Sequence, residues 1–278
     1  MIDIDPDARL LITGDAFYRA TADTLEPIPL ALAGIRASTV GADGVIYVTT
    51  STAVFTLANA GGTWTATHAW EFTPQVRLPF TIVAPRAGLL YGIDEIGQLF
   101  RSEKTGTRVL HQFEFTTAHH ERGKIIIDGD KIVAGVGPDP TLVELDANDN
   151  IRRLTLPSPS EGAVSVTRFG DLGLLVGTNA GNLRAESLGF EVIPDPLDQL
   201  PKQVQIRTLF PVGDRLFFAG NSGVFGQLTA GGFVCTSELH AGSSVRYMSM
   251  LDDQILAAGG TFENGRSDVN ITRFTIQP

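Results

Sequence analysis

The stretch Ala163 to Pro194, AVSVTRFGDLGLLVGTNAGNLRAESLGFEVIP, decides the fold because it holds four short apolar runs separated by turn residues. The first run alternates apolar and polar residues, the second (Leu174 to Thr178) is continuously apolar, and two shorter runs follow. Short runs with β-branched content, bounded by Gly and Asp, predict four antiparallel strands. A second strand that is apolar on both faces needs neighbouring sheets to cover it.

This arrangement recurs along the chain, and the start of the second strand marks each copy. The starts are Leu10, Val45, Leu89, Ile132, Leu174, Leu216 and Ile255. They are 35 to 44 residues apart, close to the ~40–45 residues of a four-stranded propeller blade. The sequence therefore predicts an all-β, seven-bladed β-propeller of four-stranded antiparallel blades, forming one domain over residues 1–278. The predicted blades are approximately 1–33, 34–72, 74–115, 116–157, 161–200, 203–240 and 243–278.

The seventh repeat supplies three strands and no clear fourth. Either the last blade has three strands and residues 1–4 form the inner strand of the first blade, or residues 1–4 complete the last blade instead. The fit of residues 1–4 to the first repeat favours the three-stranded last blade.

Composition limits the function classes. A net charge of −10 argues against general nucleic-acid binding and anionic-membrane binding, which both need a basic surface. The single cysteine, Cys235, cannot form an internal disulfide, so a buried structural thiol is expected. With no signal-peptide pattern and no apolar stretch approaching ~18 residues, the sequence favours a soluble, cytoplasmic protein.

Patterns for metals, cofactors and nucleophiles are weak or missing. There is no Gly-rich phosphate loop, no paired-Cys zinc pattern and no Gly-x-Ser-x-Gly motif. Residues 119–121, His-His-Glu, lack a third ligand at a recognisable spacing, and residues 146–150 lack the Gly and distal Glu of a calcium loop. We therefore expect no metal and no cofactor, and interpret His68, His111 and His240 as structural.

Arginines recur at one register of the inner strands. Arg36, Arg207 and Arg246 each lie nine residues before a second-strand start, and Tyr247 follows the last of them. Because inner strands begin near the axis at one face, several guanidinium groups there would form a site for carboxylate or phosphate. Arg122 lies one residue out of register, and Arg77 three. The alternative is that these arginines pair with loop carboxylates, since the chain has 17 Arg and only 4 Lys.

One turn resembles a known motif. Residues 57–64, Leu-Ala-Asn-Ala-Gly-Gly-Thr-Trp, are similar to the Asp-box of sialidases and sortilin-type receptors, with Asn59 at the Asp position. The repeats as a whole resemble those of the WD40 and YVTN-like β-propellers. The resemblance implies that the Asn59 side chain binds turn N–H groups and that Trp64 fills the space between sheets.

A sharper resemblance to sialidases concerns Val76-Arg77-Leu78-Pro79, which is similar to their Arg-Ile-Pro motif. It implies that Arg77, Arg207 and Arg246 grip a substrate carboxylate. Tyr247 or Tyr91 would then be the nucleophile and Asp94 the acid. No general-base Glu is identifiable beside either tyrosine.

Three function classes remain. The first is a non-catalytic binding or scaffold propeller that recognises a protein, a peptide or a small anionic ligand at the axial face. The second is a propeller enzyme, a hydrolase or lyase, with its site in the axial funnel. The third is a structural module of a larger assembly. Because no catalytic constellation is recognisable, the sequence favours the first class.

Overall fold

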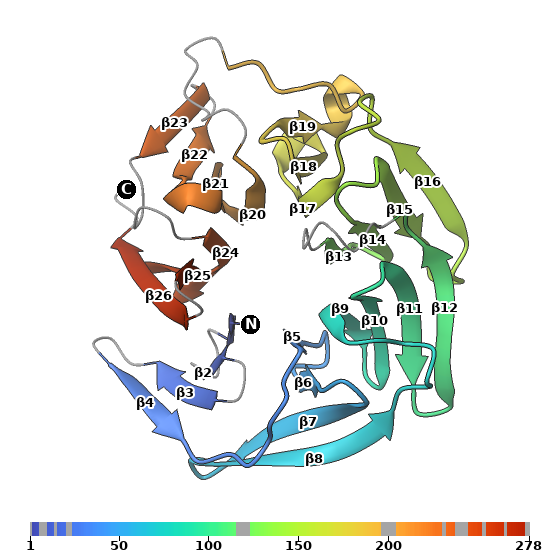
Figure 1. The fold of residues 1–278 in the computed structure, drawn as a ribbon, viewed down its shortest axis with the longest axis vertical. Coiled ribbons are helices and arrows are strands. Elements are labelled where there is room, and N and C mark those ends of the chain that lie inside the picture. Colours follow the sequence, from blue (N-terminus) through green and yellow to red (C-terminus); the bar gives the residue numbers. More distant parts are fainter. Residues whose placement is uncertain are drawn as a thin grey trace. The chain divides into compact units, whose positions relative to one another are not determined.

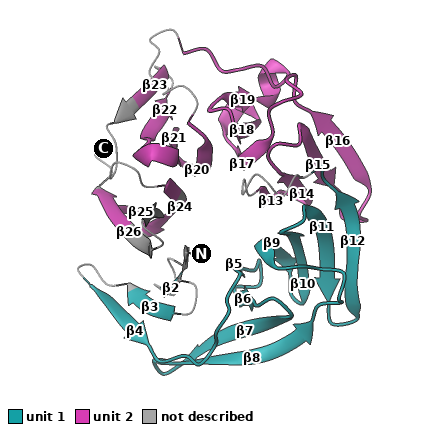
Figure 2. Ribbon diagram, viewed as in Figure 1, with its two compact units in different colours: residues 1–118 teal, residues 119–278 magenta. Residues whose placement is uncertain are grey.

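The structure is a computed structural model, and it describes residues 2–5, 10–13, 16–20, 24–114, 123–195, 204–229, 232–236, 244–251, 254–263 and 266–275. These residues form seven antiparallel sheets and three short 3-10 helices (Figure 1). None of the described helices is long and apolar enough to span a membrane. The chain divides into two compact units, residues 1–118 and 119–278 (Figure 2).

Unit 1 contains three four-stranded sheets, each built from consecutive strands. The first comprises β1 (Ile2–Asp5), β2 (Leu10–Thr13), β3 (Ala16–Ala20) and β4 (Leu25–Ile28). The second comprises β5 (Ala37–Val40), β6 (Ile46–Thr49), β7 (Ala53–Ala60) and β8 (Thr63–Glu71). The third comprises β9 (Pro79–Arg86), β10 (Leu89–Asp94), β11 (Gln98–Glu103) and β12 (Gly106–Gln112).

Unit 2 contains four sheets, two of four strands and two of three. The fourth sheet comprises β13 (Lys124–Asp128), β14 (Lys131–Gly135), β15 (Thr141–Leu145) and β16 (Ile151–Thr155). The fifth comprises β17 (Ala163–Arg168), β18 (Leu174–Thr178) and β19 (Leu183–Ala185), with the 3-10 helices η1 (Gly170–Leu172) and η2 (Glu186–Leu188). The sixth comprises β20 (Ile206–Val212), β21 (Arg215–Gly220), β22 (Phe225–Thr229) and β23 (Gly232–Thr236), with η3 (Asn221–Gly223). The seventh comprises β24 (Ser244–Leu251), β25 (Gln254–Glu263) and β26 (Arg266–Thr275).

The predicted repeats correspond to the sheets. Each of the seven predicted second-strand starts lies within one residue of the first residue of β2, β6, β10, β14, β18, β21 or β25. In the described residues the seventh sheet has three strands, and β1 pairs with β2 as the inner strand of the first sheet. The strand pairing therefore confirms the favoured alternative, in which the last sheet has three strands and the N-terminal strand belongs to the first sheet.

Sheets cover each other within each unit, as the apolar second strands require. All residues of β10 and β18 are buried. In unit 1 one apolar cluster lies between the first and second sheets and another between the second and third. In unit 2 three further clusters join consecutive sheets, and inner strands of neighbouring sheets contact each other. Burial of these faces is the main stabilising contribution to the stack.

The fifth sheet departs from the predicted four strands. The predicted fourth strand, residues 190–193, forms only an isolated bridge between Arg184 and Val192. Gly189 and Phe190 both adopt positive φ, 67° and 61°, which ends the extended chain after η2. The Phe190 side chain is buried in the apolar cluster between the fourth and fifth sheets, and its carbonyl accepts a hydrogen bond from Arg184 Nη1 at 2.8 Å. The Phe190 side chain therefore enters the core where an edge strand was expected.

The turn between β7 and β8 makes the two contacts that its sequence implied. The Gly62 N–H donates to Asn59 Oδ1 at 2.9 Å. Trp64 is buried in the apolar cluster that also contains Leu10 and Phe17 of the first sheet. The indole thus packs between two sheets, while a relationship to the Asp-box families stays a prediction.

Candidate functional site

Three inner strands of unit 2 begin with the same irregularity. In β20 residues 206 and 208 pair with consecutive residues of β21, so Arg207 is the extra residue of a β-bulge. Arg246 is the extra residue of the same bulge in β24, and Val164 is its counterpart in β17. A bulge redirects a side chain without disturbing the remaining ladder, and bulges are common beside functional sites.

The starts of these inner strands lie together. Ser165 Oγ, near the start of β17, donates to the Ile206 carbonyl at 2.6 Å, which joins the fifth sheet to the sixth. Ser244 Oγ, the first residue of β24, donates to Asn221 Oδ1 at 2.9 Å, which joins the sixth sheet to the seventh. The sequence prediction that inner strands begin at one face is supported within unit 2 by these contacts.

Arg207 is oriented by an amide network. Its Nε donates to Asn221 Oδ1 in a short hydrogen bond. Asn221 Nδ2 in turn donates to Gln205 Oε1 at 3.1 Å, and the Asn221 N–H donates to the Gln205 carbonyl. The side chain of Asn221 therefore connects residues of β20, β24 and the segment before β20, and it fixes one edge of the guanidinium group.

Lys124 belongs to the same region, although the sequence analysis did not select it. Its Nζ lies 5.9 Å from the centroid of the Tyr247 ring, so the first residue of β13 contacts β24 through a cation–π interaction. We call the following six residues the strand-start cluster: Lys124, Gln205, Arg207, Asn221, Ser244 and Tyr247. All six side chains are partly buried.

The remaining predicted arginines divide into three cases. The backbone of Arg246 is in β24, but its side chain is outside the described part of the structure, as is the whole of Arg122. Arg36, in unit 1, is exposed and precedes Ala37, the residue that pairs with Thr49. The Arg36 N–H donates to the Thr49 carbonyl at 2.8 Å, and the place of Arg36 in the arginine register stays a prediction.

The residues of the sialidase-like motif have structural contacts in the third sheet. Arg77 has an exposed side chain, and its N–H donates to Asp94 Oδ2 at 2.9 Å. Asp94 is buried, and its other oxygen accepts from the Ile96 and Gln98 N–H groups. Burial raises the pKa of the Asp94 carboxyl above its ordinary value, against the lowering effect of these backbone donors. Tyr91 is also buried, in β10 of the same sheet.

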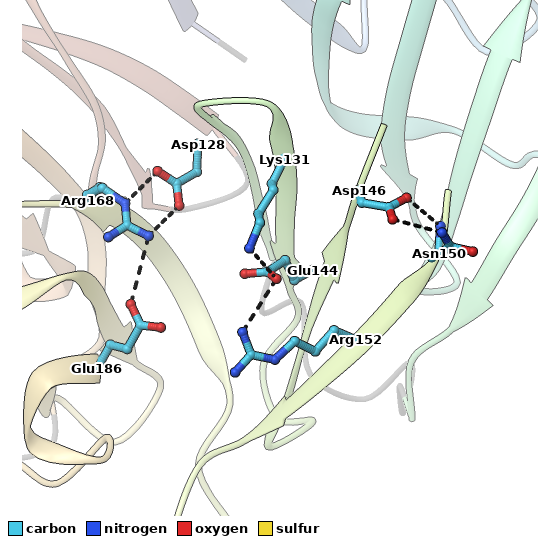
Figure 3. Close-up of polar contacts among 8 residues, drawn as sticks. All are labelled: Asp128, Lys131, Glu144, Asp146, Asn150, Arg152, Arg168 and Glu186. Carbon is cyan, nitrogen blue, oxygen red and sulfur yellow. Dashed lines mark hydrogen bonds and ion pairs between the residues drawn. The ribbon is translucent and has the colours of Figure 1, made fainter. Parts of the chain in front are cut away.

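A second polar region of unit 2 contains two groups of ion pairs, one joining the fourth and fifth sheets and one within the fourth sheet (Figure 3). Arg168 donates to Asp128 Oδ1 and Oδ2 at 2.5 and 2.6 Å, and its Nη2 lies 3.8 Å from Glu186. The bidentate bond to Asp128 raises the pKa of Arg168 further. On β14 to β16, Lys131 and Arg152 both contact Glu144, at 2.8 and 3.6 Å. The hydrogen bond to Glu144 raises the pKa of Lys131.

A buried ion pair holds the fifth sheet where its fourth strand is missing. Arg184 Nε and Nη2 donate to Glu161 Oε2 and Oε1 at 3.0 and 2.9 Å, and Asn182 Nδ2 also donates to Oε1. Burial raises the pKa of the Glu161 carboxyl, but the hydrogen bonds from Arg184 and Asn182 outweigh it, so this pKa lies below its ordinary value. The pair is a structural bridge from β19 to the segment before β17.

The other candidates from the sequence have structural partners or lie outside the described residues. Asp146 accepts from the Asn148 and Asn150 N–H groups and from Asn150 Nδ2, at 2.8 to 2.9 Å (Figure 3). These donors, led by the Asn150 side chain, lower the pKa of Asp146 and make the segment a closed hairpin turn. The rings of His68 and His111 pack edge-on against Phe55 and Phe113. Residues 119–121 and His240 are outside the described part, in which no group of three metal-ligating side chains occurs.

Comparison with known proteins shows the fold. No known family and no curated protein matches the sequence. Among solved structures, YCF48 bound to D1 peptide superposes with a TM-score of 0.67 at 15% identity, covering 96% of this chain and 89% of that one. Virginiamycin B lyase from Staphylococcus aureus superposes with a TM-score of 0.68 at 16% identity, covering 92% of this chain and 89% of that one. The Myceliophteria thermophila Cps50 (Swd1) β-propeller domain superposes with a TM-score of 0.63 at 14% identity, covering 96% of this chain and 94% of that one. Together these likenesses show that the chain has a β-propeller fold, which is shared by a peptide-bound protein and a lyase.

Proposed function

We propose that the protein is a non-catalytic binding propeller that holds a peptide or protein segment at the strand-start cluster. The observation that carries this proposal is the linkage of the starts of β13, β20 and β24 by partly buried polar side chains. Arg, Tyr and amide side chains are typical of interfaces, because they combine apolar contact area with hydrogen bonding. The peptide-bound YCF48 structure supports the proposal, since a propeller of similar fold carries a peptide.

The following features of the described residues support the binding proposal. Arg207 is held by Asn221 of its own sheet, and Tyr247 is contacted by Lys124 of the fourth sheet, as a preformed recognition surface requires. Asp94 and Tyr91, the acid and one nucleophile implied by the sialidase resemblance, are buried in the third sheet. We include Arg246 in the binding site because it occupies the same bulge position as Arg207. Arg36, Arg77 and Arg122 stay candidate ligand-binding residues predicted from the sequence.

We further propose that the seven sheets are the blades of a single seven-bladed propeller forming one domain. The support is the sequence repeat together with the pairing of β1 in the first sheet. Small-angle scattering of the full chain tests this, because one closed domain has a radius of gyration of about 18–19 Å by size scaling. A distinctly larger radius for a monomer would contradict closure.

The binding proposal is tested by selecting peptides from a random 12-residue phage library on the immobilised full chain. We expect enriched peptides that bind the parent and bind at least about tenfold more weakly to the Tyr247→Ala and Asn221→Ala variants. Arg153→Ala is the matched control, since Arg153 is an exposed residue of β16 in the same unit. No enrichment, or enriched peptides that bind all variants equally, would refute the proposed site.

A further inference from the structure

We propose that the outer edge of β8 is a self-association surface, on which a second copy of this chain adds its own β8 as an antiparallel strand. The two second sheets, of four strands each, thereby form one continuous eight-stranded sheet about a two-fold axis. The edge belongs to unit 1 and the strand-start cluster to unit 2, so this inference goes beyond the proposed function and does not depend on it.

The strand β8 forms the outer edge of the second sheet. In the part of the chain that the structure describes, it pairs with β7 and with no other strand. The turn at residues 61–62 joins the two strands, and its glycines have the φ angles of a type I′ turn, 61° and 88°. The residues that flank such a turn bond to each other, so Thr63 and Thr65 bond to β7. Trp64 and Ala66 alternate with them and direct their N–H and C=O groups outward, as a template for an added strand.

The fourth strands of the other four-stranded sheets are shorter, and most carry features that discourage strand addition. The strand β4 contains Pro27, β12 contains Arg108, and β16 contains two arginines. The strand β23 has only five residues, whereas β8 has nine. β8 has no proline, lysine or arginine, and its one acidic residue, Glu71, is its last. This long edge therefore lacks the protection that natural edge strands usually have.

The sequence of β8 is suited to pairing with itself. Thr63, Thr65 and Thr67 are exposed and lie on one face of the strand. A two-fold axis at Thr65 places Thr63 of each copy opposite Thr67 of the other, so every pair on this face joins two threonines, which hydrogen bond across strands. An identical copy brings identical charges, but the paired segment has none. The two Glu71 residues then lie at opposite ends of the pair, about 40 Å apart at the rise of an extended chain.

Association through one strand pair should be weak. It rests on main-chain hydrogen bonds and a narrow strip of side chains, which places it at the low end of specific interfaces. Sedimentation equilibrium of the full chain from about 5 to about 500 µM tests it, because a weak dimer forms only as the concentration rises. The average mass should rise from 29.7 kDa towards twice this value. Added sodium chloride should strengthen the association, since it screens the repulsion between two copies of net charge −10.

Two variants address the edge itself. Thr65→Lys places two ammonium groups opposite each other at the axis, where like charges destabilise a strand pair. Ala66→Pro removes an outward N–H group and leaves the bonds of Thr63 and Thr65 to β7 in place. Each variant should weaken the dimer at least about tenfold. Thr155→Lys is the matched control, because it adds the same charge to an exposed threonine of another outer strand, β16, and should dimerise like the parent.

A charge exchange at the axis keeps the result interpretable if a variant folds poorly. Thr65→Lys and Thr65→Glu should each associate poorly alone, and an equimolar mixture should form a heterodimer, because the axis sets the two residues opposite each other. A mixture that associates no better than its components, or a parent that stays monomeric over the whole range, would overturn the inference. Growth beyond the dimer would also overturn it, since an isologous contact leaves no free β8 edge.

Discussion

Two arginines of unit 2 are held in opposite ways. Arg184 is buried, and its described hydrogen bonds go to a buried carboxylate and a backbone carbonyl. Arg207 is partly exposed at a strand bulge, and its Nε bonds an amide oxygen. In the first arrangement a buried positive charge is paired with a buried negative charge, and removing one partner strongly destabilises the protein. The second fixes the position of a charge at the surface.

The difference separates a structural arginine from a candidate binding residue better than sequence register does. Both residues lie in short strands of the same unit, and both follow an apolar residue. Among the hydrogen bonds described above, those of Arg184 include a buried carboxylate and that of Arg207 goes to an amide oxygen, and Arg184 is the more deeply buried. The following predictions use this contrast, beginning with the substitution that should lower the free energy of unfolding most.

Arg184→Met should lower the free energy of unfolding by about 3–5 kcal/mol, because it leaves Glu161 buried without its cation. Urea denaturation followed by tryptophan fluorescence measures the loss. The double variant Arg184→Met, Glu161→Met should regain part of it, since no buried charge remains. A single variant within about 1 kcal/mol of the parent would show that the pair is not structural.

Glu161→Gln should cost about 3 kcal/mol at pH 7, and the cost should shrink in acid. The pKa of Glu161 is lower in the folded protein than in the unfolded chain. Its contribution is therefore complete above the unfolded pKa of about 4.3 and is lost as the pH falls through the folded value. Urea midpoints of parent and variant between pH 7 and pH 3 should converge. A constant difference across this range would contradict the assignment.

Arg168→Met should cost about 1 kcal/mol or less, although the pair with Asp128 is bidentate. The Arg168 side chain is 49% exposed, so solvent screens the interaction. The difference between parent and variant should fall further in 1 M sodium chloride. A loss that matches that of Arg184→Met would mean that the network in Figure 3 is a major stabilising element.

Arg207→Met should change stability least, by about 0.5 kcal/mol, because Ser244 still donates to Asn221 Oδ1 in the variant. Its effect should be on binding, with affinity for selected peptides reduced about tenfold. Urea denaturation and peptide titration on the same samples provide both numbers. A large loss of stability with unchanged binding would place Arg207 with Arg184 among the structural arginines.

The sheets were predictable because their signal is local. Each second strand is an apolar run bounded by turn residues, and its spacing repeats, so strand order followed from the sequence alone. The fifth sheet was mispredicted because the Phe190 run has strand composition. Its positive φ and its packing into the core are set by contacts with Arg184 and the fourth sheet, which no local pattern contains.

The candidate site was only partly predictable. Arg207 and Arg246 share a bulge because their hairpins have matching lengths, so counting residues located both. For Arg36 the position stays a prediction, since the turn at residues 41–45 is longer than the one at residues 213–214 and the same count does not imply the same pairing. Lys124 was missed because its contact with Tyr247 joins distant repeats. Side-chain partners across sheets depend on packing, which repeat spacing does not encode.

The bulges at the start of β20 and β24 place two side chains outside the pairing pattern of their sheets. Since Arg207 and Arg246 are extra residues, neither takes part in the one-to-one pairing that sets which neighbours face the core. Exchanging these two side chains leaves the alternation of the remaining strand intact. Under the proposed function, substitutions at these two positions should therefore change ligand preference while the rest of each sheet keeps its sequence.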